Sequence, residues 1–161
     1  MIKVESGMNF IVDEFTYIME DDSFYNKISS KYQTKDVDFI IKRNSKLLFI
    51  EAKTSSPKVL DRYTNEIVTK FTDSLIIFIG IILDRKNTKS SIISKEMKNI
   101  NHLKNSILFV LIIKNAKKEY LAPISNILNK KLRKINIMFS IESSVIVMNE
   151  TQAISRRFVS V

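Results

Sequence analysis

Two neighbouring segments in the first third of the chain carry the clearest strand pattern. Residues 36–43 (DVDFIIKR) and 46–54 (KLLFIEAKT) are dense in branched and aromatic side chains, which favour β-strands. Asn44-Ser45 between them has the chemistry of a tight turn, and the Ser-Ser-Pro segment at 55–57 ends the second strand. The pattern therefore predicts a β-hairpin with a two-residue turn.

Other segments repeat apolar residues at three- and four-residue steps, which predicts amphipathic helices. The longest such segment is 59–83, and residues 8–20 show the same spacing. We also expect a helix from Pro123 through Lys134 and a short closing helix over 151–158. Residues 24–32 are ambiguous and could contain a short first strand.

Two further strands are expected in the second half of the chain. Residues 106–113 (SILFVLII) form a near-continuous apolar run, as in a strand covered on both faces, and 145–148 form a shorter strand. Residues 85–104 are polar and predict an exposed connection with one helical turn. The order of elements predicts a single α/β domain with a mixed central sheet flanked by helices, with a core at about 8–113 and an extension at 114–161.

Composition narrows the chemistry that this domain can perform. The 161 residues are 45% hydrophobic and include no cysteine and one histidine, His102. These counts exclude disulfides, thiolate metal sites and imidazole clusters, so a bound metal would need oxygen ligands. The first residues lack the apolar core of a signal peptide. Because the longest apolar run, residues 75–83, is about half of what a bilayer crossing needs, we expect a cytoplasmic protein without a membrane partner.

The charge balance favours a polyanionic partner. Twenty-six Lys and Arg residues oppose 17 Asp and Glu residues, a formal net charge of +9, which points to nucleic acid before anionic membrane. The alternative is a basic protein whose charges only form solvated faces. The candidate phosphate contacts are Arg85, Lys86, Lys89, Lys130, Lys131, Arg133 and Lys134, and Arg156-Arg157 is a similar basic pair.

The predicted register of the hairpin places acidic residues and a lysine close together on one face. With a two-residue turn, Asp38 lies opposite Glu51 and Asp36 lies opposite Lys53, all on one face. Opposed carboxylates about 5 Å apart at Cβ repel each other, and a divalent cation between them reverses that penalty. Lys53 could then orient or deprotonate an attacking water, or neutralise phosphate charge.

The opposite face of the hairpin is apolar and is expected to pack against helices. That face consists of Val37, Phe39, Ile41, Leu48, Ile50 and Ala52. The alternative to a metal site is an exposed cross-strand ion pair, which contributes little to stability. A three-residue turn would also remove the opposition of the two acids.

Asp38, followed after twelve residues by Glu51-Ala52-Lys53 on a hydrophobic strand, resembles the PD-(D/E)xK nuclease superfamily. That family includes restriction endonucleases and archaeal Holliday-junction resolvases. The resemblance implies a restriction-endonuclease-like core with the order helix, three-strand meander, helix and strand, in which Asp38 and Glu51 bind Mg²⁺ or Mn²⁺ and Lys53 assists the attacking water. Val37 departs from the proline that often precedes the Asp.

The resemblance also implies further site residues. Many members add an acid from the first helix, for which Glu14 is the candidate catalytic residue and Glu5 the second choice. Such families often place substrate contacts at the start of the helix after the hairpin. Lys70, with Tyr63 and Glu66 nearby, is therefore a further candidate nucleic-acid contact.

The function expected from the resemblance is a metal-dependent endonuclease that hydrolyses DNA, as a homodimer or with partner subunits. Its setting would be a defence, restriction, recombination or mobile-element system. One alternative is a non-catalytic nucleic-acid-binding or scaffold subunit with the same fold. Another is an RNA endonuclease of the superfamily, a class that often has a histidine before the Asp, which this chain lacks. The last is an unrelated basic α/β interaction protein.

Overall fold

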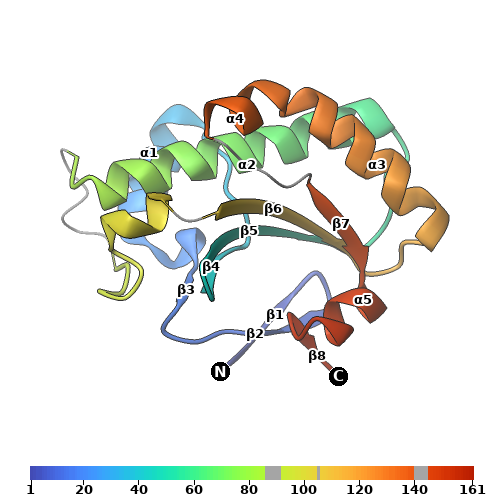
Figure 1. The fold of residues 1–161 in the computed structure, drawn as a ribbon, viewed down its shortest axis with the longest axis horizontal. Coiled ribbons are helices and arrows are strands. Elements are labelled where there is room, and N and C mark those ends of the chain that lie inside the picture. Colours follow the sequence, from blue (N-terminus) through green and yellow to red (C-terminus); the bar gives the residue numbers. More distant parts are fainter. Residues whose placement is uncertain (86–91, 105, 140–144) are drawn as a thin grey trace.

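The described residues form two β-sheets, with long helices over one face of the larger sheet (Figure 1). The computed structural model describes residues 1–85, 92–104, 106–139 and 145–161. The strands are β1 (Ile2–Glu5), β2 (Met8–Ile11), β3 (Thr16–Tyr17), β4 (Phe39–Arg43), β5 (Lys46–Lys53), β6 (Ser106–Ile113), β7 (Ile146–Asn149) and β8 (Val159–Ser160). The helices are α1 (Ser23–Tyr32), α2 (Leu60–Ile82), α3 (Lys118–Lys131), α4 (Arg133–Met138) and α5 (Glu150–Ser155), with the 3₁₀ helices η1 (Met19–Asp21) and η3 (Ile100–Lys104).

The larger sheet has the order β3-β4-β5-β6-β7. The strands β3, β4 and β5 pair antiparallel, whereas β5, β6 and β7 pair parallel. In sequence α2 connects β5 to β6 and α3 lies between β6 and β7, as parallel neighbours require a crossover. The expectation of an α/β fold with a mixed central sheet flanked by helices is thus confirmed.

The β4–β5 hairpin has the register that the sequence predicts. Arg43 pairs with Lys46, and the ladder continues through Ile41 with Leu48 to Phe39 with Ile50. Asn44 lies in the turn with a φ of 55°, a left-handed conformation that asparagine tolerates well. The strands over 106–113 and near 145–148 are also confirmed, as is the long helix near 59–83.

The two faces of the larger sheet are covered differently. On one face, Leu47 and Phe49 pack with Phe71 and Phe78 of α2. On the other face, the apolar residues of β4 and β5 pack against the three-stranded sheet β1-β2-β8 and α5 (Figure 1). The expectation that this second face packs on helices is therefore largely wrong. Val37 also departs from it, because it joins the cluster on the α2 side.

The predicted helix over residues 8–20 is wrong. Residues 8–11 form β2, in which Met8 and Phe10 are buried and Asn9 is only partly so, and β3 follows at 16–17. The buried residues alternate along the strand, and over so short a segment the spacing of the apolar residues also fits a helix. The hairpin turn before β2 uses Gly7, whose φ is +72°.

The first helix lies later in the chain than expected. Residues 24–32, which were expected to hold a short strand, belong to α1. Asp22 caps this helix, since its side chain accepts a hydrogen bond of 2.8 Å from the Phe24 N–H. Because α1 lies between β3 and β4, the order of elements differs from the expected helix followed by a three-strand meander.

The C-terminal elements have shifted boundaries. The helix expected from Pro123 begins earlier, at Lys118, and ends at Lys131, where the short α4 takes over. The closing helix expected over 151–158 ends at Ser155, and β8 follows it. In the described part of the chain, no helix is long and apolar enough to span a bilayer.

Candidate active site

The site lies where the C-terminal half of β5 passes under the first half of α2. Glu51 and Lys53 alternate with Ala52 along β5, so both side chains point to the face that α2 covers. Glu66 and Lys70 lie four residues apart on α2, on one side of the helix. This packing brings two acids and two lysines from distant parts of the sequence together.

Glu51 is the most deeply buried charged residue of the site. Its side chain is 1% exposed, and Oε1 lies 2.7 Å from Lys70 Nζ and 3.1 Å from Lys53 Nζ. Neither carboxylate oxygen receives a hydrogen bond of good geometry from the described residues. Burial raises the pKa of Glu51, and the two ammonium groups oppose that rise. The carboxylate is therefore stabilised mainly by the two ion pairs.

Lys53 lies between two carboxylates. Its Nζ is 3.1 Å from Glu51 Oε1 and 2.9 Å from Glu66 Oε1. Burial alone would lower the pKa of Lys53, but the two acids together raise it. Lys53 is therefore a protonated, positively charged group at neutral pH.

Asp38 stands at the point where the β4–β5 ladder ends. The last pair is Phe39 with Ile50, so the predicted pairing of Asp38 with Glu51 is not part of the ladder. Asp38 Oδ2 instead accepts a hydrogen bond of 2.6 Å from the Ala52 N–H. The Asp38 side chain thus takes the place of a backbone acceptor opposite β5. Burial, with a further contribution from the charge of Glu51, raises the pKa of Asp38 from 3.8 to about 8. The two predicted metal ligands therefore lie close enough to repel each other.

The predicted opposition of Asp36 and Lys53 is wrong. Asp36 precedes the end of the ladder, and its Oδ1 accepts a hydrogen bond of 2.8 Å from the Tyr25 hydroxyl. Lys53 turns instead toward Glu51 and Glu66 on the α2 side. The predicted register is correct, but the strand pairing ends before it can bring these two residues together.

Glu5, and not Glu14, is the additional acid near Asp38. Glu14 is exposed in the connection between β2 and β3 and belongs to no helix, and its carbonyl accepts a hydrogen bond of 2.8 Å from Ser94 Oγ. Glu5 ends β1, and its charge contributes to the raised pKa of Asp38. Glu5 Oε1 accepts a bond of 2.9 Å from the Ser6 N–H, and Ser6 Oγ in turn donates to the Ala52 carbonyl at 3.1 Å.

Tyr63 completes the wall of the site on α2. Its hydroxyl is buried without a hydrogen-bond partner among the described residues. The pKa of Tyr63 is raised by burial, and also by the charges of Glu51 and Glu66. The helical spacing of Tyr63, Glu66 and Lys70 places them near the hairpin's end, as expected, whereas nothing in the sequence indicates that Lys70 pairs with Glu51.

The predicted phosphate contacts are dispersed. Lys131 is held by α2, with its Nζ 2.6 Å from Asp61 Oδ1 and 2.5 Å from Asn65 Oδ1. Arg85 is exposed just beyond the end of α2, and Lys86 and Lys89 lie outside the described residues. Lys130, Arg133 and Lys134 are exposed near the junction of α3 and α4. Of the predicted contacts that the structure describes, Lys70 is the one that lies beside the acids.

The donor set fits a magnesium-type cation held by two carboxylates. Such ions need only one or two protein carboxylates, with water and phosphate oxygens as the remaining ligands. Asp38 and Glu51 supply two, and the Glu51 oxygens lack hydrogen bonds of good geometry. Within the described ranges, no group of three or more acidic or histidine side chains is arranged to hold a metal. A bound cation would also have to displace Lys70 from Glu51.

The raised pKa of Asp38 predicts that stability falls as the pH rises. Between about pH 4 and pH 8 the folded protein binds more protons than the unfolded chain, so the free energy of unfolding decreases across this window. We expect a decrease of about 2 kcal/mol between about pH 6 and pH 8 in EDTA. Asp38→Asn should remove most of it. Urea unfolding at several pH values measures the free energy of unfolding of wild type and of Asp38→Asn. A wild-type free energy of unfolding that does not change with pH would contradict the prediction.

Comparison of the chain with protein-family models, curated protein sequences and solved structures gives no match. The candidate site therefore rests on its own geometry. That geometry consists of a buried carboxylate, a second carboxylate with a raised pKa, and two lysines within ion-pair distance of the first.

Proposed function

We propose that this chain is a Mg²⁺- or Mn²⁺-dependent endonuclease that hydrolyses DNA phosphodiester bonds. The observation that carries the proposal is the buried Glu51 carboxylate beside Asp38, with Lys53 at 3.1 Å. Two close carboxylates repel each other and lower the stability of a folded protein. Their presence in a buried site therefore points to a function that needs both of them. The order Asp38, Glu51, Lys53 and its resemblance to the PD-(D/E)xK superfamily support the same proposal.

Asp38 and Glu51 would hold the divalent cation. When bound, such an ion polarises the phosphodiester and makes water a better nucleophile. Lys53 stays protonated between its two acids, so it stabilises the negative charge that grows on the phosphate during attack. Glu66 positions the Lys53 ammonium, and Lys70 neutralises Glu51 until a cation is bound.

The remaining parts of the proposal concern the fold family and the substrate. We propose that the hairpin, α2 and β6 form the second half of a restriction-endonuclease-like core, and that α1 takes the position of its first helix. The formal charge of +9 favours a nucleic-acid substrate. We propose DNA as that substrate, and a homodimer or partner subunits to provide specificity.

A non-catalytic nucleic-acid-binding subunit with this fold is the second candidate. One observation favours it: Lys70 Nζ already lies 2.7 Å from Glu51 Oε1 and neutralises the acid that a cation needs. If that ion pair is more stable than the cation complex, the chain would bind nucleic acid without cleaving it.

The decisive experiment measures cleavage and metal binding separately. Purified protein is incubated with supercoiled plasmid, linear duplex, single strands, branched DNA and RNA, in Mn²⁺, Mg²⁺ or EDTA. We expect nicking of DNA with either metal ion and none in EDTA. Cleavage that persists in EDTA would contradict the proposal, and preferred cleavage of RNA would correct the substrate.

Calorimetry with Mn²⁺ tests the site itself. Wild type should bind the ion and Asp38→Ala should not, because one carboxylate of the pair is lost. Asp61→Ala, which removes an exposed acid from α2, is the matched control and should bind like wild type. Absence of both binding and cleavage in the wild type would favour the non-catalytic candidate.

A further inference from the structure

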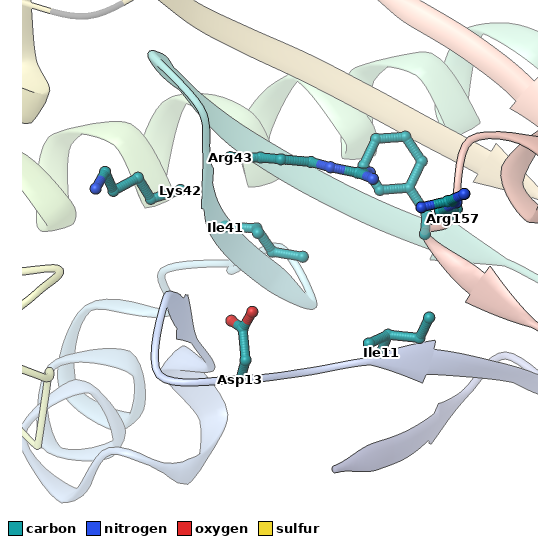
Figure 2. A pocket seen from close by; sticks show the side chains of 7 residues that line it. Ile11, Asp13, Ile41, Lys42, Arg43 and Arg157 are labelled. Carbon is teal, nitrogen blue, oxygen red and sulfur yellow. The ribbon is translucent and has the colours of Figure 1, made fainter.

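A group of basic side chains lies at the other end of the β4–β5 hairpin, next to its turn. There a pocket of about 260 Å³ opens between β4, the end of β2 and the C-terminal turn. Its lining is Ile11, Asp13, Ile41, Lys42, Arg43, Arg157 and Phe158. Figure 2 shows Arg43 extending toward Arg157 on one side, with Lys42 on the other side and Asp13 between them.

An adjoining pocket of about 210 Å³ shares Arg43 and Phe158 with the first and adds Lys46 and Arg156 to the lining. The pair of pockets therefore carries five basic residues. We call this group the turn-end cluster: Lys42, Arg43, Lys46, Arg156 and Arg157.

Among the described residues, the charges of the turn-end cluster form no ion pair with an acid. Some lysines elsewhere are paired, as Lys98 is with Asp84 at 2.7 Å and Lys131 with Asp61 at 2.6 Å. The acid in the first pocket, Asp13, already accepts hydrogen bonds from the Phe15 N–H and Thr16 Oγ1. The cluster thus has an unbalanced positive charge that an external anion would neutralise.

The central guanidinium of the cluster is held in place. Arg43 Nη1 donates a 2.8 Å hydrogen bond to the Arg156 carbonyl, and its guanidinium carbon lies 5.2 Å from the centre of the Phe158 ring. Arg157 has a φ of 58°, a backbone conformation that costs about 1 kcal/mol for a residue other than glycine. A side chain held as that of Arg43 is loses less entropy when it binds an anion.

We propose that the turn-end cluster binds backbone phosphates of a nucleic acid, at a contact separate from the acidic site. The choice of nucleic acid as the polyanion rests on the proposed function. Guanidinium groups bind phosphate with two parallel hydrogen bonds, and the cluster contains three of them. Lys46 and Glu51 are five residues apart on β5, about 17 Å along the strand. The second pocket is lined by Leu48, Leu108 and Val110 of the sheet face that packs on β1-β2-β8, whereas Glu51 points to the face that α2 covers, so the two contacts are separate.

The test measures binding in EDTA, where the proposed cleavage cannot occur. Fluorescence anisotropy follows a labelled duplex of about 20 base pairs with wild type, Arg43→Gln/Arg157→Gln and Lys46→Gln/Arg156→Gln. We expect each double variant to bind about tenfold or more weakly, with the salt slope of log K reduced by about 2. Lys27→Gln/Lys95→Gln removes the same charge from exposed positions outside the cluster and should bind much like wild type.

The second variant pair alters two exposed side chains, so it keeps the test valid if loss of Arg43 impairs folding. Wild-type affinity and salt slope in both folded double variants would overturn the proposal. Vesicles that contain anionic phospholipid are tested in the same way. Weaker binding of the double variants to these vesicles, with unchanged affinity for duplex, would also overturn the proposal, because the surface would then be a membrane contact. A protein that binds duplex through the cluster but never cleaves it would contradict the nuclease proposal and still support the phosphate contact proposed for the cluster.

Discussion

Lys70→Met is expected to lower the free energy of unfolding by about 3 kcal/mol at neutral to mildly alkaline pH. Lys70 Nζ lies 2.7 Å from the Glu51 carboxylate, whose side chain is 1% exposed. Of the groups that lower the pKa of Glu51, Lys70 has the largest effect. Removing it leaves a buried charge with only Lys53 to balance it. Urea unfolding in EDTA measures the loss.

Lys131→Met is the matched control for this substitution. Lys131 also joins α2 through an ion pair, at 2.6 Å from Asp61, but the Asp61 side chain is 79% exposed. Water screens that pair, so its loss should change stability far less. Equal losses in the two variants would show that burial of Glu51 is not the cause.

A second substitution separates charge from packing. In Lys70→Met/Glu51→Gln the buried charge is absent, so the variant should recover much of the stability that Lys70→Met loses. Lower pH should have the same effect on Lys70→Met alone, because protonation of Glu51 removes the unbalanced charge. If neither change restores stability, packing of the Lys70 side chain accounts for the loss.

Local sequence patterns were sufficient for the centre of the fold. The β4–β5 hairpin and β6 follow from branched and aromatic runs with a turn between them, and the register follows from the two-residue turn at Asn44-Ser45. The N-terminal segment could not be predicted in this way. Met8 and Phe10 are buried against the second face of the sheet, and a short apolar alternation also fits helical spacing.

The acidic site was predictable only where it depends on β5. Glu51 and Lys53 share a face because strand side chains alternate. The pairing of Glu51 with Lys70 depends on how α2 crosses the sheet, and the proximity of Glu5 to Asp38 depends on how β1 is placed by the second sheet. The failed pair of Asp36 and Lys53 has a local cause, since the Asp38 side chain ends the ladder by binding the Ala52 N–H.

If the chain is a nuclease, Lys53→Met should lower the cleavage rate by about 100-fold or more at saturating Mn²⁺. The ammonium lies 3.1 Å from Glu51 and 2.9 Å from Glu66, and these acids raise its pKa against the effect of burial. It therefore acts as a fixed positive charge rather than as a base. Its removal takes away charge stabilisation that the transition state needs more than the ground state does.

Metal affinity distinguishes this role from simple loss of the cation site. Lys53 repels a cation at Glu51, so Lys53→Met should bind Mn²⁺ as tightly as wild type or more tightly in calorimetry. Glu66→Gln should have an intermediate effect on cleavage, because it leaves the ammonium present but less well positioned. Single-turnover rates with plasmid DNA measure both variants. A Lys53→Met protein that cleaves at the wild-type rate, or that no longer binds Mn²⁺, would contradict the assigned role, since a positive charge near the phosphate should affect the chemical step and not metal retention.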